Sequence, residues 1–71
     1  IYNNYMDKYA QLVEVIRKNV DKKHIGQVNL ILQQVESYGF QSELVHMYEN
    51  NMLNAPSHLD FLYSFCSEWD I

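Results

Sequence analysis

The chain has 71 residues, of which 48% are hydrophobic and 14% aromatic, and this content is too high for a disordered segment. Nine carboxylates against five Lys and Arg give a net charge of −4, which argues against binding to nucleic-acid phosphates and suits either solubility or a basic protein partner. The length predicts one domain over residues 1–71, and with only two glycines and one proline long regular elements are expected.

Cysteine usage and hydropathy indicate the expected environment. The lone cysteine, Cys66, cannot form a disulfide within the chain, so packing must supply the stability and a reducing compartment such as the cytoplasm is expected. No apolar run approaches the roughly 20 residues of a membrane span, and no signal-peptide pattern occurs. The chain begins at Ile1 rather than Met, which suggests a fragment of a longer protein as an alternative to a whole domain.

The first predicted helix covers residues 2–19. Its apolar residues recur every three or four positions, as in an amphipathic helix. The residues of this stripe are Tyr2, Tyr5, Met6, Tyr9, Leu12, Val13 and Ile16, and Val20 continues it just after the helix. The leading tyrosines either form a recognition patch or, as such stripes more often do, belong to the core with their hydroxyls at its edge.

The second predicted helix covers residues 22–38 and forms an antiparallel hairpin with the first, because the connection is short. Asp21 suits its N-cap, and Gly39 suits the left-handed position after its last residue. Leu30 projects from the side opposite to the apolar stripe. It either contacts a further layer or is an exposed leucine.

Two more helices are predicted, over residues 42–51 and 58–69. Asparagines and Pro56 end the third helix, because both favour turns and proline disfavours helix in the residue before it. The fourth opens with the sequence SHLD, in which Ser57 is the N-cap and Asp60 takes the place of the usual glutamate in a capping box.

The last predicted helix is unusually apolar. On a wheel of 100° per residue its apolar side chains cover an arc of about 200°, twice the width that a core-facing helix needs. Phe61, Phe65 and Trp69 follow one another by one turn along a flank of that arc. Such a helix is either wedged among the other three or partly covered by another molecule, and the sequence leaves both possibilities open.

These patterns together predict an all-α fold, a small four-helix bundle-like domain in which the last helix packs across the others. The predicted core consists of Tyr9, Leu12, Val13, Ile16, Val28, Ile31, Leu32, Val35, Leu44, Val45, Tyr48, Leu59, Leu62, Tyr63 and Cys66.

No arrangement of residues indicates catalysis or a cofactor. His24, His46, His58 and Cys66 are too widely spaced to supply the paired ligands of a structural zinc site. Cys66 falls within the apolar arc, where a thiol behaves as a small hydrophobe rather than as a nucleophile. The carboxylates fall on predicted polar faces, and no Gly-rich phosphate loop occurs. We therefore expect no enzyme, no metal and no cofactor.

The middle of the chain has the order helix, glycine-bearing turn and helix, as in helix-turn-helix proteins. Its second helix carries Glu43 and Glu49 but no Lys or Arg, which argues against a recognition helix. Nucleic-acid binding is therefore only the third hypothesis for the function.

The leading hypothesis is a small acidic protein-binding module: an adaptor, an inhibitor or an immunity-type partner that acts by occlusion. The predicted partner-binding residues are Trp69, Phe65, Phe61 and Tyr2, with Glu68 and Asp70 as charges at the rim. The second hypothesis is a structural helical subdomain or a homo-oligomerisation domain, covered by the rest of its polypeptide or by a second copy. The expected partner is thus a protein, and no membrane partner is expected.

Overall fold

The computed structural model describes the backbone of residues 4–51 and 55–71 and the side chains of residues 7–50 and 55–71. The described elements are α1 (Asn4–Lys18), the 3-10 helix η1 (Lys22–His24), α2 (Ile25–Tyr38), α3 (Gln41–Asn51) and α4 (His58–Trp69). The prediction of a small all-α, bundle-like domain is confirmed. None of the described helices is long and apolar enough to cross a membrane.

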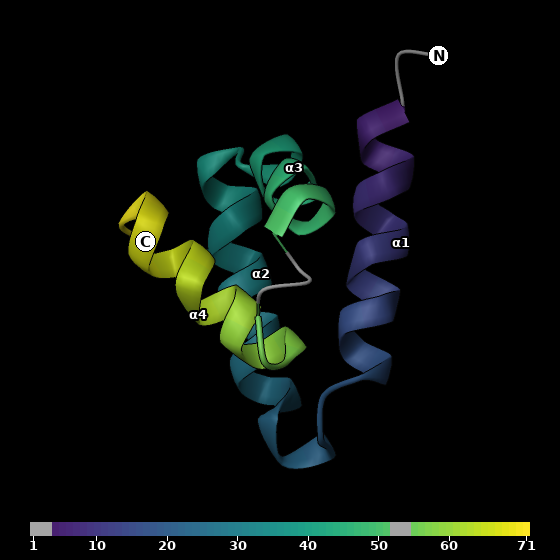
Figure 1. Cartoon of the computed structure of the whole chain (residues 1–71), viewed down its shortest axis with the longest axis vertical. Helices are drawn as coiled ribbons and strands as arrows, with labels where there is room; N and C mark the ends of the chain where they lie inside the picture. Colours follow the sequence, from purple (N-terminus) through teal and green to yellow (C-terminus); the bar gives the residue numbers. More distant parts are fainter. Residues whose placement is uncertain (1–3, 52–54) are drawn as a thin grey trace.

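Helices α1 and α2 form the predicted antiparallel hairpin, and α4 crosses in front of α2 in this view and ends on the side away from α1 (Figure 1). Two hydrogen bonds join the hairpin near its two ends. The Tyr9 hydroxyl donates to the Glu36 carboxylate at 2.7 Å, and the Arg17 guanidinium donates to the side-chain oxygen of Asn29 at 3.0 Å.

The start of α2 differs from the prediction. The Asp21 side chain makes no capping hydrogen bond, and one 3-10 turn precedes α2, which begins at Ile25. The His24 N–H donates to the Asp21 carbonyl at 2.9 Å, so a backbone bond of the 3-10 turn satisfies this donor where a side-chain cap was expected. Asp21 is therefore a turn residue at this junction.

The end of α2 confirms the role of Gly39. Its φ of 73° is left-handed, and it allows the N–H of Phe40 to donate to the Val35 carbonyl at 2.9 Å, as in a Schellman motif. The Phe40 carbonyl then accepts from the Leu44 N–H at 2.9 Å and so begins α3. One glycine thus lets two helices follow each other with almost no loop.

Helix α4 has a defined cap at each end. The Ser57 hydroxyl oxygen accepts from the Asp60 N–H at 3.2 Å, which confirms the predicted N-cap, and the hydroxyl donates to the Asp60 carboxylate at 3.0 Å. At the other end Asp70 is left-handed with φ 58°, and the Ile71 N–H donates to the Cys66 carbonyl at 3.1 Å. The chain therefore turns sharply after α4.

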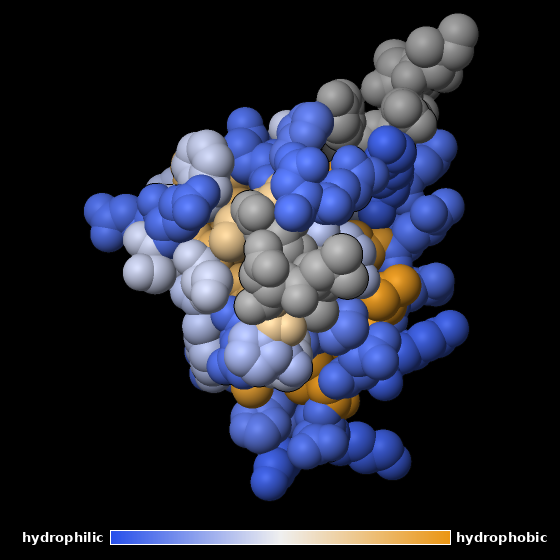
Figure 2. Space-filling model, in the orientation of Figure 1, coloured by the Kyte–Doolittle hydropathy of each residue, from blue (hydrophilic) through white to orange (hydrophobic). Residues whose placement is uncertain are grey.

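All four helices contribute to the core, which consists of Tyr9, Leu12, Ile16, Val28, Ile31, Leu32, Val35, Leu44, Val45, Phe61, Leu62 and Phe65. Val13, Tyr48, Leu59 and Cys66 are only partly buried, so they lie at the edge of the predicted core. Tyr63 was predicted to be buried but is 45% exposed. Figure 2 shows apolar residues between α1 and the neighbouring helices, with hydrophilic side chains around them.

Candidate protein-interaction surface

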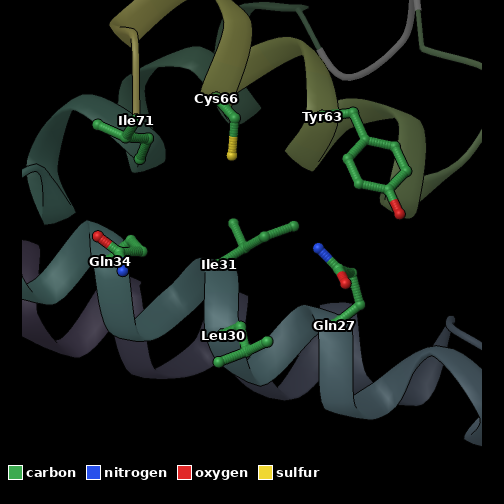
Figure 3. Close-up of a pocket in the computed structure, with 7 residues that line it drawn as sticks. All are labelled: Gln27, Leu30, Ile31, Gln34, Tyr63, Cys66 and Ile71. Carbon is green, nitrogen blue, oxygen red and sulfur yellow. The ribbon is translucent and has the colours of Figure 1, made fainter.

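A groove of about 270 Å³ runs between α2 and α4, and we call it the α2–α4 groove. It is lined by Gln27, Leu30, Ile31, Gln34, Tyr63, Cys66 and Ile71 (Figure 3). Two of these residues, Leu30 and Tyr63, are 58% and 45% exposed, so apolar surface continues from the groove onto both of its sides. An open, mostly apolar groove with exposed apolar side chains at its sides is a candidate binding site for another protein.

Helical spacing explains the α2 side of the groove. Gln27 precedes Leu30 and Ile31 by three and four residues, and Gln34 follows them by four and three, so all four lie on one side of α2. Ile31 is nearly buried and points between the two helices, whereas the Gln27 and Gln34 side chains lie to either side of it (Figure 3). The groove therefore has an apolar floor with an amide at each end.

Ile71 closes one end of the groove because of the left-handed residue before it. The positive φ of Asp70 turns the chain back, and the Ile71 side chain packs against the core. Figure 3 shows Ile71 opposite Gln34, while Tyr63 lies opposite Gln27 at the other end. An apolar contact made just after the helix is a regular companion of this capping geometry.

Cys66 places its sulfur in the groove between α4 and Ile31 (Figure 3). The thiol is free and partly buried, and burial raises its pKa. A thiol that stays protonated at neutral pH is a poor nucleophile and contributes apolar surface instead. Cys66 therefore belongs to the apolar lining of the groove.

The groove and the exposed face of α2 are almost free of charge. No Asp, Glu, Lys, Arg or His side chain lines the groove. The exposed residues of α2 other than Glu36 are Gly26, Gln27, Asn29, Leu30, Gln33, Gln34, Ser37 and Tyr38. Glu36 is engaged by the Tyr9 hydroxyl of α1. Depletion of charge is a property of the central part of protein interfaces, because apolar and amide groups lose less hydration free energy there than ions do.

The predicted partner-binding phenylalanines lie elsewhere. Phe61 and Phe65 are 1% and 0% exposed, so they belong to the core of this chain and not to its surface. They occupy the middle of the arc that α4 buries in this chain, where Tyr48 packs edge-on against Phe61 at a centroid distance of 5.4 Å. A side chain buried in its own core has no free area left for a partner.

Trp69 is the one predicted aromatic that reaches the surface among the described residues. It is 37% exposed, and its ring packs against Phe40 and Phe65 with centroid distances of 5.1 and 5.9 Å. Glu68 and Asp70 beside it are exposed, as expected for rim charges, although Asp70 also caps α4. Tyr2 lies outside the described residues.

In the part of the chain that the structure describes, no three or more His, Cys, Asp or Glu side chains are gathered as a metal ion would require. The Nε2 atom of His58 lies 3.4 Å from the Tyr48 hydroxyl, and burial lowers the pKa of its imidazole. This contact joins α3 to the first turn of α4, so it is part of the packing between the helices.

Comparisons of this chain with protein-family models, with curated proteins and with solved structures find no match. A proposal for its function therefore rests on the surface itself, since an all-α fold alone is compatible with many functions.

Proposed function

We propose that this chain is a protein-binding module that docks another polypeptide in the α2–α4 groove. The observation that carries the proposal is the uncharged apolar groove with the exposed Leu30 and Tyr63 at its sides. An occupant that covers these side chains removes apolar surface from water without stripping any ion of its hydration.

An adaptor, inhibitor or immunity-type partner would work in this way, by occupying a surface rather than by chemistry. The net charge of −4 favours a partner with basic residues around its apolar contact. We also place the module in a reducing compartment such as the cytoplasm, because its single thiol is free and lines the proposed site.

Relative to the sequence-based hypothesis, the proposed site moves from one flank of α4 to the other. Tyr63 and Cys66 replace Phe61 and Phe65, while Leu30 supplies the opposite side. A structural subdomain remains the second candidate function, because the rest of a longer polypeptide could cover the same exposed Leu30.

The proposal is tested by affinity capture with matched variants, using the immobilised chain and mass spectrometry to identify the proteins bound. Leu30→Glu places a charge in the α2–α4 groove, and Val15→Glu places one on a 36% exposed valine of α1. The wild-type chain and Val15→Glu should retain the same partner, whereas Leu30→Glu should lose it. A partner that all three chains retain equally would contradict the proposed site.

Circular dichroism of the three chains provides the control for folding. Both substituted side chains are exposed, so the helical signal and the urea midpoint should change little. Iodoacetamide labelling of Cys66 gives a further readout. Because the sulfur lies in the groove, a bound partner should slow the reaction in the wild-type chain and in Val15→Glu.

A further inference from the structure

We infer that the occupant of the α2–α4 groove is a second copy of this chain, which packs its own groove against the first about a two-fold axis near Leu30. This inference rests on the proposed function, since it names the partner for the same surface. The reasons are the symmetry of the α2 face and the distribution of charge at the two ends of the groove.

The α2 face is close to symmetric about Leu30. Gln27 precedes Leu30 by three residues and Gln34 follows it by four, so both amides lie one turn away. Antiparallel pairing of two α2 helices brings Gln27 of one copy beside Gln34 of the other. Each amide has donors and an acceptor, so the pair can satisfy itself, and an isologous interface repeats this contact twice.

The charges of the chain are strongly divided along the sequence. All five Lys and Arg lie in residues 1–23, together with three carboxylates, whereas residues 24–71 hold the other six carboxylates and no Lys or Arg. The segment 17–23, which joins α1 to α2, holds four of the five cations and a single acid, Asp21. A basic turn thus stands next to one end of the groove.

The opposite end of the groove is acidic. Glu68 and Asp70 are exposed at the end of α4, and no basic residue occupies the last turn of that helix. Carboxylates at a helix C-terminus are destabilising, because they face the negative end of the helix dipole. One carboxylate, that of Asp60, lies near the basic end, where it already accepts a hydrogen bond from the Ser57 hydroxyl. Lys22 and Lys23 are exposed there.

An antiparallel pairing matches these ends. The Lys22 and Lys23 end of one copy approaches the Glu68 and Asp70 end of the other, and this happens at both ends of the interface. A parallel pairing would place like charges together at each end. The uncharged centre then carries the apolar contact between the Leu30 side chains and the neighbouring tyrosines.

The covered face is one helix with one neighbouring flank, so the dimer should be weak, with a Kd between about 10 µM and 1 mM. Sedimentation equilibrium up to ~1 mM chain measures it. The wild-type chain and Val15→Glu should dimerise with equal Kd, and Leu30→Glu should weaken the dimer at least about tenfold. A wild-type chain that stays monomeric to ~1 mM overturns the inference, as does a dimer that Leu30→Glu leaves unchanged.

A charge exchange tests the antiparallel arrangement. One variant carries Lys22→Glu with Lys23→Glu, and the other carries Glu68→Lys with Asp70→Asn, in which asparagine keeps a residue that tolerates positive φ. Each variant alone should dimerise roughly tenfold more weakly than the wild-type chain, and an equimolar mixture should recover a heterodimer. Adding Leu30→Glu to both should abolish that recovery. No recovery in the mixture would overturn the two-fold arrangement.

The outcomes for the dimer and for the proposed function are distinguishable. If the wild-type chain is monomeric but Leu30→Glu loses a partner that the wild-type chain captures, only the dimer is refuted and the groove stays a binding site. If Leu30→Glu changes neither the captured partners nor the self-association, the proposal that the groove is a binding site is refuted as well.

Discussion

Two apolar grooves of similar size flank the bundle, and they differ in charge. The groove between α1 and α3 measures about 240 Å³ and includes Leu12 and Val15, but it is crossed by an ion pair of 3.3 Å between Lys8 and Glu49. The α2–α4 groove has no Asp, Glu, Lys, Arg or His side chain in its lining. A partner that entered the α1–α3 groove would have to displace this ion pair and its hydration, so similar volumes do not make equivalent sites.

The two sides also differ in how their helices are held. Polar side chains tie α1 to α2 and to α3, through Tyr9, Arg17 and Lys8. Among the described residues no side-chain hydrogen bond or ion pair is found between α2 and α4, and α4 is anchored by buried Phe61 and Phe65. The α4 side should therefore respond most to loss of apolar volume, and the α1 side to loss of polar partners.

The largest effect is expected for Phe65→Ala. Phe65 is 0% exposed, and removing a buried phenylalanine ring costs about 3–5 kcal/mol, a large part of the stability of a domain this small. Urea unfolding followed by circular dichroism should show a strongly lowered midpoint. Trp69→Ala is the matched control, because its ring is 37% exposed and its loss should cost clearly less. Equal losses would contradict the assignment of Phe65 to the core.

Tyr9→Phe should have a smaller effect on the α1 side. The substitution keeps the buried ring but removes the 2.7 Å hydrogen bond to Glu36, which leaves that carboxylate to water and should cost about 0.5–1.5 kcal/mol. Urea unfolding at pH 7 measures the loss. In the background Glu36→Gln the same substitution should cost less, because the acceptor is then uncharged. An identical cost in both backgrounds would show that this charged hydrogen bond does not contribute.

The pH dependence of stability should report His58. Burial lowers its folded-state pKa below the usual value near 6.5, so the unfolded chain binds the proton more readily. The free energy of unfolding that comes from neutral His58 is present above pH ~6.5 and falls as the pH drops through the lower folded-state pKa. Unfolding curves between pH 8 and pH 5 for the wild-type chain and His58→Gln measure the difference.

Tyr48→Phe separates two causes of that pH dependence. The variant loses the hydroxyl 3.4 Å from the imidazole but keeps the ring that packs beside it. Because burial causes the shift, Tyr48→Phe should keep the wild-type difference between pH 8 and pH 5, whereas His58→Gln should reduce it. A wild-type slope in His58→Gln would refute the role of this histidine.

The smallest effect is expected for the ion pair across the α1–α3 groove. Both partners are about half exposed, with 44% and 48% of their side-chain surfaces accessible, so water and salt screen the attraction. A double-mutant cycle of Lys8→Ala and Glu49→Ala should give a coupling of about 0.2–1 kcal/mol at low salt and less in 1 M NaCl. A larger, salt-independent coupling would place the pair in a drier environment.

Much of the fold could be predicted because its signals are local. The 3,4 spacing of apolar residues identified the four helices, and Gly39 and Ser57 fixed two of their ends through backbone geometry and side-chain capping. The sequence predicts the start of α2 one turn too early, at residue 22, because a 3-10 turn and the first turn of an α-helix have similar sequence patterns. Such errors are confined to one turn.

The groove depends on information that is not local. The apolar arc of α4 includes both the buried Phe65 and the exposed Tyr63. Which flank of the arc the other helices bury depends on how α4 is placed against α2. The return of Ile71 over Gln34 depends on a left-handed aspartate, which helical periodicity does not indicate. One sequence signal does point to the groove. The segment from Ile25 to Tyr38 contains a single charged residue, Glu36, and such depletion of charge on an exposed helix face indicates an interface.

The attachment of α4 has a consequence for the behaviour of the chain in the cold. Beyond its first turn α4 is held by apolar and aromatic contacts, and such contacts weaken on cooling because apolar hydration has a large heat capacity. The polar links of α1 do not share this temperature dependence. Near the freezing point α4 should therefore be the first helix to loosen, and amide hydrogen exchange measured there should become faster in α4 before it does in α1.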